Sequence, residues 1–359
     1  MVELIIKRLA YGLLILFGVV TVVFLLFNIL PGDPARMLMG QRSDEASLEA
    51  IKKDMGLDRP VGTQYIKYLN DLSPLSFHNA RNVENYFFLD TNRYNIIITL
   101  FETNKGNVLV IKSPYLRRSY QSKKPVIEII NESLLNTFIL AIAAMTFASL
   151  LGIFLGIISA LNRNKFIDRA FLILSTLGMS LPSFFAAILM AWFFAFVLGD
   201  YTGLNMTGNL YEIDNFGNGK YLSLKNLILP ALTLGIRPLT IIIQLSRNSL
   251  LEVLSQDYIR TAKAKGLNKN RVLFKHALKN SLNPVITAIS GWLASLMAGV
   301  VFVEFIFGWK GLGYVIVNAL NSYDFPVVMG VVLIISVIFI IINIIVDIIY
   351  GIIDPRVNN

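Results

Sequence analysis

The side chains that most often carry catalysis or bind metals are scarce in this sequence and form no catalytic pattern. There is no cysteine, and the two histidines are His78 and His276, so a thiolate metal site is excluded and a dedicated transition-metal site is not expected. No phosphate-binding loop G-x-x-x-x-G-K-[ST] occurs, nor do G-x-S-x-G or H-E-x-x-H. We interpret both histidines as surface side chains and predict that the chain is not an enzyme.

Charged residues inside apolar segments are the next place to look for chemistry, because ion-coupled carriers place acidic or histidine side chains there. Glu304 and Asp347 lie near the ends of apolar runs, where we expect water or lipid headgroups to reach them, and Arg237 lies deeper. For Arg237 a functional role and a structural one, by snorkelling or by pairing with a neighbouring subunit, are equal alternatives. These three residues are too few for a proton relay.

Most of the chain consists of apolar runs long enough to cross a membrane as helices. Of its 359 residues 55% are hydrophobic and 15% are charged, and the mean hydropathy is +0.62, whereas soluble proteins are about one quarter charged. Each crossing needs about 20 apolar residues. The sequence therefore predicts an all-α polytopic membrane protein with six spans, at 9–30, 134–161, 166–198, 224–250, 282–307 and 327–353.

The distribution of lysine and arginine predicts the orientation of these spans. Residues 162–169 and the loop 251–281 are basic, whereas the loops 199–223 and 308–325 are acidic or nearly neutral. Because basic residues collect in short cytoplasmic loops, we predict that both termini are cytoplasmic. The net charge of +9 has the same explanation and does not require a nucleic-acid partner.

One loop on the opposite side, residues 31–131, is long enough to contain structure of its own. We expect surface helices over 43–57, where Ser43 is a suitable N-cap, and over 59–72. Two β-branched runs at 95–102 and 107–112 flank a turn and predict a hairpin, and 85–89 could add another strand. The loop is thus expected to form a small extracytoplasmic α+β subdomain.

The cytoplasmic loop 251–281 combines many basic residues with a single glycine. We expect a helix continuing from the fourth span, a reversal at Gly266, and a second helix capped by Asn268. The small residues Thr261, Ala262 and Ala264 would let another backbone approach, and the lysines offer charge complementarity to a partner. A helix lying on the lipid surface is the alternative, but the loop lacks the wide aromatic-rich face that insertion requires.

Many motifs in this order resemble one family, the permeases of binding-protein-dependent ABC importers, and within it the first of the two paired permeases of the dipeptide/oligopeptide/nickel group. They extend over most of the chain: "NILPGDPA", "MGLDRPVGTQYIKYL", "RRSYQSKKPVIEII", "LGMSLPSFF", "LPALTL", "SRNSLLEVLSQDYIRTAKAKGL", "HALKNSLNPVIT", "VEFIFGWKGLGYVIVNAL", "DFPVVMG" and "VDIIYGIIDPRV". Two departures concern the cytoplasmic loop. Arg260 replaces the acidic residue of the general motif, and Pro284 lies farther from the glycine.

The resemblance implies a type I ABC importer permease architecture. Its parts are an N-terminus and first span at 1–30, an extracytoplasmic loop at 31–131, and a permease core at 132–359. Residues 77–114 have no recognised counterpart in such permeases and are interpreted as an insertion. The implied partners are a second homologous permease subunit, two ATP-binding subunits that hold ATP and Mg, and an extracytoplasmic substrate-binding protein. The implied location is a bacterial or archaeal cytoplasmic membrane.

Two sets of candidate residues follow, the first from the resemblance and the second from the polar, bent and adaptable positions of the spans themselves. The first set would couple the chain to its ATPase: Asp257, Tyr258, Arg260, Thr261, Ala262, Lys263, Ala264, Lys265, Gly266 and Leu267. The second set would line the translocation path: Ser180, Pro182, Ser183, Arg237, Trp292, Ser295 and Met297. A purely structural kink at Pro182, and close helix packing of the small residues in the fifth span, are equal alternatives. We expect Pro182 to interrupt the hydrogen bonding of the third span.

The implied function is uptake of di- or oligopeptides by an ATP-driven importer. Alternatives are a nickel or other small-solute importer of the same group, a membrane scaffold or receptor that transports nothing, and an ion-coupled carrier. The basic loop argues against a receptor, which would not need it, and the ion-coupled carrier would transport without any ATPase.

Overall fold

A computed structural model describes residues 2–29, 45, 49, 52–53, 56–94, 96–213, 219–299 and 301–353. The chain forms two compact units. Unit 1 comprises residues 1–12, 133–317 and 335–359, and unit 2 comprises residues 13–132 and 318–334. The helix predicted over 43–57 lies largely outside the described residues.

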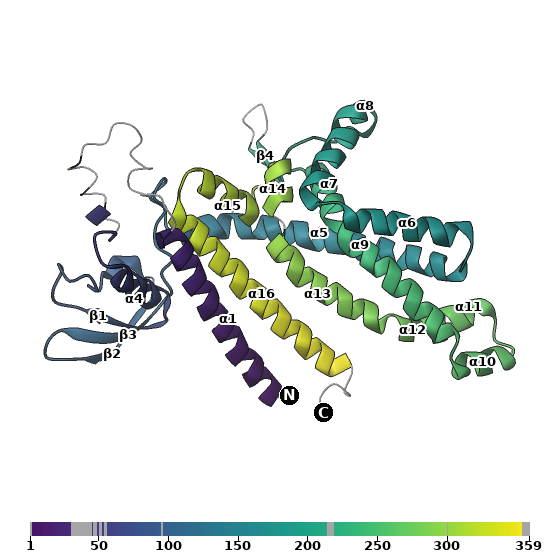
Figure 1. The fold of residues 1–359 in the computed structure, drawn as a ribbon, viewed down its shortest axis with the longest axis horizontal. Helices are drawn as coiled ribbons and strands as arrows, with labels where there is room; N and C mark the ends of the chain where they lie inside the picture. Colours follow the sequence, from purple (N-terminus) through teal and green to yellow (C-terminus); the bar gives the residue numbers. More distant parts are fainter. Residues whose placement is uncertain are drawn as a thin grey trace. The chain divides into compact units, whose positions relative to one another are not determined.

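The long apolar runs of the sequence form helices that can cross a membrane (Figure 1). Four are single helices: α1 (Val2–Ile29), α5 (Val126–Leu161), α9 (Lys225–Leu254) and α16 (Phe325–Ile353). Two more are bent pairs of helices. One consists of α6 (Phe166–Ser180) and α7 (Ser183–Met190), which continues to Val197. The other consists of α13 (Asn283–Gly299) and α14 (Val301–Phe307). Counting each pair as one span, the described residues contain the six predicted spans.

The third span is more sharply broken than a proline kink would require. Helices α6 and α7 meet at 110°, and Leu181 has an extended backbone with ψ 129°. Pro182 forces this conformation because its ring clashes with a helical residue before it. The span then continues beyond α7 as a π-helical stretch, Ala191–Val197. The third span thus consists of two helical segments, the arms before and after Leu181, and not of one straight helix.

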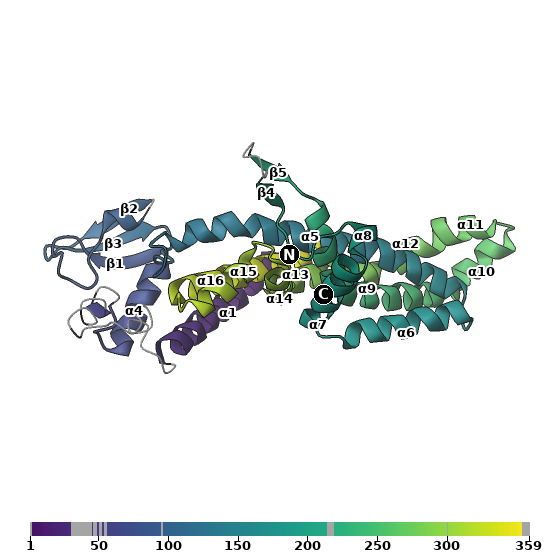
Figure 2. The same cartoon turned by 90° about the horizontal axis from the view of Figure 1, so that it is seen from above.

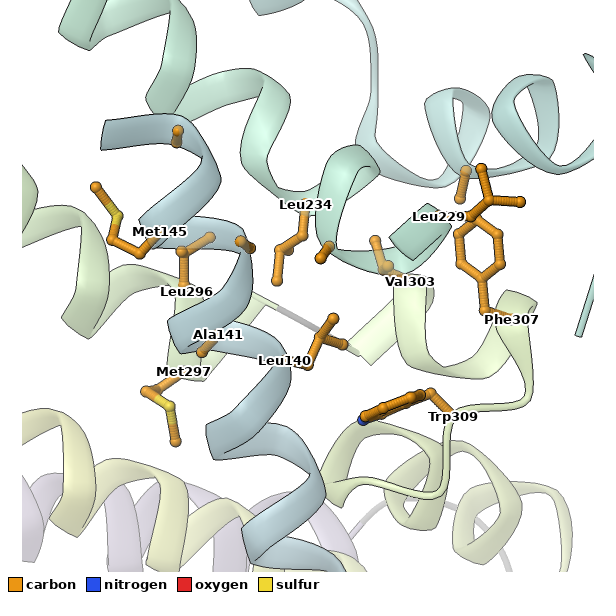
Figure 3. Packing of buried hydrophobic residues seen from close by; sticks show 14 of the residues in the cluster. Leu140, Ala141, Met145, Leu229, Leu234, Leu296, Met297, Val303, Phe307 and Trp309 are labelled. Atoms are coloured by element: carbon orange, nitrogen blue, oxygen red, sulfur yellow. The ribbon is translucent and has the colours of Figure 1, made fainter. Parts of the chain in front are cut away.

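The core of unit 1 is an apolar cluster between α5, α9, α13 and α14 (Figure 3). Leu140, Leu234, Phe307 and Trp309 are all buried there. The indole of Trp309 donates a hydrogen bond to the Asn136 carbonyl, at 2.9 Å, so its polar edge is satisfied. The helices α6 and α9 also pack together, as Figures 1 and 2 both show.

The prediction that water reaches Glu304 is wrong. Its side chain is completely buried, and its carboxylate accepts hydrogen bonds from Thr137 Oγ1 at 2.7 Å and from the Gly313 amide at 2.7 Å. The Glu304 carboxylate thereby accepts a hydrogen bond from an amide in the first turn of α15 (Leu312–Asn321), where backbone amides have no partner within the helix. This helix lies within the predicted loop 308–325. Asp347 pairs instead with Arg8, at 3.0 Å.

Unit 2 combines a short helix with a small sheet, which lies beside the helix in Figures 1 and 2. The helix α4 (Val61–Leu72) is the one predicted over 59–72. The predicted hairpin is also confirmed, as β2 (Ile97–Glu102) and β3 (Asn107–Lys112). A single 3₁₀ turn, Thr91–Arg93, precedes β2.

The third strand of this sheet is not the predicted one. Strand β1 (Leu75–Asn79) pairs antiparallel with β3 and gives the order β1-β3-β2, whereas residues 85–89 contribute only a single bridge between Asn79 and Phe88. His78 therefore lies in β1 and is 3% exposed, so its interpretation as a surface residue is wrong. Period-two burial along β1 places it on the inner face.

The remaining elements of unit 1 are short. The loop 199–223 contains α8 (Gly199–Thr202) and the paired strands β4 (Tyr211–Ile213) and β5 (Lys220–Leu222). The basic loop contains α10 (Asp257–Ala264), α11 (Lys269–Arg271), a π-helical stretch (Val272–Ala277) and α12 (Leu278–Ser281). Figure 1 shows α10 and α11 at the end of unit 1 where α5 passes into α6.

Candidate functional site

The predicted coupling segment is a separate short helix, α10. The sequence predicts that the fourth span continues to Gly266, but the helix breaks earlier, at Ser255 and Gln256, where Gln256 is extended with ψ 150°. A new helix starts at Asp257. The break detaches the basic segment from the long axis of α9 and leaves it as a compact element of eight residues.

Gly266 ends α10 with a left-handed residue, at φ 76°. The amide of Leu267 bonds to the Ala262 carbonyl at 3.4 Å, and the amide of Gly266 bonds to the Lys263 carbonyl at 3.0 Å. Together these bonds form a Schellman motif, which satisfies carbonyls that a helix end otherwise leaves free. The predicted tight reversal at Gly266 is therefore present. Asn268 caps α11 as predicted, with its side chain accepting from the Asn270 amide.

One face of α10 packs against the rest of unit 1. Ile259 and Ala262 are buried in an apolar cluster with Ala160 of α5, Leu250 of α9 and Val272. Ala262 was predicted to leave room for a partner, but it contacts its own chain, because i and i+3 lie on the same helical face. This packing anchors one face of α10 in unit 1, mainly against the following stretch Val272–Ala277, with residues of α5 and α9 completing the cluster.

The opposite face of α10 is exposed and mainly cationic. Asp257 and Arg260 form an exposed ion pair at 3.3 Å, with side chains 94% and 74% exposed. The Thr261 hydroxyl donates to the Asp257 carbonyl, and Tyr258 accepts a hydrogen bond from Asn280, at 3.0 Å each. The other exposed residues of the segment are Lys263, Ala264, Lys265 and Gly266. Such a face offers positive charge and small side chains to an acidic partner.

An ion pair that was not predicted ties α9 to α6 near this element. Arg247 donates from Nε to Asp168 Oδ1 at 2.6 Å and from Nη2 to Oδ2 at 2.8 Å. Ser159 of α5 and the Asn164 amide donate to the same carboxylate. Asp168 is 1% exposed. A bidentate pair with further hydrogen bonds is the strongest form of such a contact, so α5, α6 and α9 are joined at one point.

Four of the predicted pathway residues come together in unit 1. Ser183, Arg237, Trp292 and Ser295 all line one cavity of about 90 Å³. It lies between α7, α9 and α13, at the break in the third span. Arg237 donates from Nη2 to the Leu181 carbonyl at 3.2 Å. The guanidinium thus provides a hydrogen bond to a carbonyl at the point where the helix is interrupted.

The other three predicted pathway residues lie elsewhere. Pro182 is the residue before α7 and causes the bend, as predicted. The Ser180 hydroxyl donates to the Thr176 carbonyl within its own helix, at 2.9 Å. Met297 is 3% exposed within the core cluster of Figure 3 and is not among the residues that line the cavity. Residue type and helical spacing do not separate a lining residue such as Trp292 from a core residue such as Met297.

The sequence matches the family "Binding-protein-dependent transport system inner membrane component" over residues 152–359, and the N-terminal component of such systems over residues 1–84. The chain belongs to this family. It is thus a multi-pass membrane permease, and members of the family are transporter subunits. The two matches leave 85–151 uncovered, a range that contains most of the proposed insertion at 77–114.

Curated relatives cover nearly the whole chain. It is 32% identical to the "Dipeptide transport system permease protein DppB" of Alkalihalophilus pseudofirmus, over 98% of both chains. It is 31% identical to the "Di/tripeptide transport system permease protein DppB" of Pseudomonas aeruginosa, over 100% of this chain and 99% of that protein. It is 33% identical to the "Probable D,D-dipeptide transport system permease protein DdpB" of Escherichia coli, over 98% and 97%.

Among solved structures, an inward-facing MetNI methionine ABC transporter aligns with 62% of this chain and 95% of that chain, at 18% identity and a TM-score of 0.47.

Proposed function

We propose that the chain is a permease subunit of an ATP-driven importer of di- or oligopeptides that an external binding protein delivers. The names of the relatives, each a permease of dipeptides or of di- and tripeptides, support this substrate class. A permease for nickel or another small solute remains the alternative within the same group. A second homologous permease subunit would complete the pathway.

The proposal places energy conversion on other subunits. Two ATP-binding subunits would hold ATP and Mg²⁺ and dock against α10 on the cytoplasmic side, where both termini would also lie. The observation that carries this proposal is the geometry of α10. Its buried face packs in an apolar cluster that includes residues of α5 and α9. Its opposite face presents two cations, Arg260 and Lys263, and one acid, Asp257, to the exterior of the chain. A rigid helix transmits a displacement without rearranging its own hydrogen bonds.

Movement of α10 would reach the membrane segments through two contacts. The apolar cluster at Ile259 connects it to α5 and α9, and the Arg247–Asp168 pair connects α9 to α6. The arm α6 leads to the break at Leu181, where Arg237 and the small cavity lie. Because the end of α6 lines this cavity, displacement of α6 would change the shape of the cavity. This supports a role of the cavity as part of the pathway.

Charge reversal tests the coupling surface directly. The complete complex, reconstituted in liposomes, is assayed for ATP-dependent uptake of a labelled dipeptide with Arg260→Glu on α10, and with Arg271→Glu on α11 as the matched control. Both side chains belong to exposed residues of the same basic loop. We expect Arg260→Glu to lower uptake about tenfold through lost charge complementarity, and Arg271→Glu to change it little. Equal effects of the two variants would contradict the assignment of α10.

The substrate is tested in the same liposomes by competition. Unlabelled di- and tripeptides should compete for uptake, whereas Ni²⁺ should not. Competition by Ni²⁺ alone would support the alternative substrate. ATP-independent uptake by the chain without ATPase subunits would indicate an ion-coupled carrier, and absence of any uptake by an assembled, ATP-hydrolysing complex would indicate a scaffold.

A further inference from the structure

Unit 2 contains a large cavity that the proposed transport mechanism does not use. Its volume is about 580 Å³, which lies within the range of about 300–1,000 Å³ for small-molecule sites. Its cationic lining residues are Lys53, Lys67, Arg93, Arg117, Arg118 and Lys123, against two acids, Asp71 and Asp90. All of these residues belong to unit 2.

The acids do not balance the cations. Asp71 is 3% exposed and faces two of the cations, with Lys67 Nζ at 3.4 Å from Oδ1 and Arg117 Nε at 3.9 Å from Oδ2. Asp90 pairs with Arg93, at 2.9 Å. Each acid is therefore already engaged, and the cationic excess is concentrated in one concave space.

Lys67 is the most deeply buried of these six cations. Its side chain is 8% exposed, and burial is the main cause that lowers its pKa, while Asp71 opposes the effect and Arg93 and Arg117 add to it. Burial therefore disfavours the charged form of the Lys67 ammonium. An anion in the cavity would stabilise it, since opposite charge favours the protonated form.

The lining also provides hydrogen-bond donors. Guanidinium groups bind carboxylates and phosphates through two parallel hydrogen bonds. Tyr86 and Tyr115 line the same space, and burial raises the pKa of both, so their hydroxyls stay protonated and can donate. The cavity is concave, partly open to solvent and lined by residues of one unit, a shape that admits a small ligand.

We propose that this cavity binds a small anion that carries two or more carboxylate or phosphate groups. Such a ligand places one anionic group beside Lys67 and Arg117 and another beside the more exposed Arg93 and Arg118. The anion is either a free solute or the headgroup of an anionic lipid, because both present the same chemistry. Neutral molecules of the same shape are not bound.

Calorimetry on the full chain tests the proposal, in nanodiscs of zwitterionic phosphatidylcholine. The probes are succinate and pyrophosphate, with succinamide as the uncharged analogue. We expect saturable binding of at least one anion, no binding of succinamide, and weakening as salt is added. Addition of phosphatidylglycerol to the nanodisc distinguishes a lipid headgroup from a free solute as the natural ligand. If the cavity binds the headgroup, the lipid competes and lowers the affinity for the soluble anion. If the cavity binds a free solute, that affinity stays the same.

Three variants locate the binding. Arg93→Gln and Arg118→Gln should each weaken the anion about tenfold, the typical effect of a hydrogen bond to a charged group. Arg81→Gln is the matched control, because Arg81 is a cation of the same unit that pairs with Glu102 at 3.2 Å and does not line the cavity. Circular dichroism verifies that each variant is folded. Absence of saturable anion binding, equal binding of succinamide, or an equal loss in Arg81→Gln would overturn the proposal.

Discussion

Arg247 of α9 and Asp168 of α6 form a bidentate ion pair, although they are 79 residues apart in the sequence. Asp168 is nearly fully buried and Arg247 is 15% exposed in its side chain. Ser159 donates to the same carboxylate from α5. The three helices that carry the proposed coupling element and the broken span are therefore connected through a single carboxylate.

Removing one partner of this pair should destabilise the chain strongly. Asp168→Asn leaves the partly buried Arg247 guanidinium without its counter-ion, and breaking a buried pair typically costs about 3–5 kcal/mol. Thermal unfolding in detergent measures the change. Asp257→Asn is the control, because the Asp257–Arg260 pair is exposed and exposed pairs contribute little. A similar shift for both variants would show that the buried pair has no special role.

Gly266→Val should uncouple ATP hydrolysis from uptake. The residue is left-handed at φ 76°, and beyond its two chain neighbours no atom lies within 4 Å of the position that a Cβ would take. The cost therefore comes from the backbone, about 1–2 kcal/mol for a residue with a Cβ. Gly266→Asn should retain function, since asparagine tolerates this conformation. ATPase activity and uptake are measured in parallel in the reconstituted complex. Normal uptake by the valine variant would argue against the role of this turn.

Gly156→Ala should weaken the packing of α5 on α9. A Cβ at Gly156 would lie 2.6 Å from Ser246 Cβ and 2.8 Å from the Ile243 carbonyl oxygen, and overpacking typically costs about 1–3 kcal/mol. Gly291→Ala is the matched control, because nothing lies within 4 Å of its added Cβ. The unfolding temperature of the purified chain should fall only for Gly156→Ala. An equal fall in both would point to a general effect of helix glycines.

His78 should make the stability of unit 2 depend on pH. Burial, followed by the charges of Lys67 and Lys112, lowers the pKa of His78 from 6.5 to about 4, against a smaller opposing effect of Asp71. Between these values the unfolded chain binds a proton that the folded chain does not, so the free energy of unfolding falls as the pH drops from about 6.5 to about 4.

Hydrogen exchange of the β1–β3 amides at pH 4.5 and pH 7 measures this dependence. Protection should be lower at the acidic pH, and His78→Gln should reduce the difference because glutamine does not titrate. His276→Gln, the only other histidine substitution possible, should leave the difference unchanged. Equal protection at both values of pH in the unmodified chain would contradict the role of His78.

Sequence patterns predicted the features that depend on neighbouring residues. Apolar length identified the spans, Pro182 identified the break in the third span, and Gly266 identified the reversal after α10. Each is a property of a few consecutive residues, since hydropathy, a proline ring and a missing Cβ act on the local backbone. The sequence also placed Ser183, Arg237, Trp292 and Ser295 among the pathway candidates, and the structure brings these four together around one cavity.

The features that were mispredicted or missed depend on segments far apart in the sequence. The sequence by itself determined a multi-span membrane protein with a short basic helix that ends at Gly266, because these follow from local composition and backbone chemistry. Only the tertiary structure decided that Glu304 is buried against Thr137, 167 residues away, that Ala262 faces its own chain, and that six cations surround one cavity. A side chain's partners and its exposure to water are set by the packing of distant segments, which no local pattern specifies.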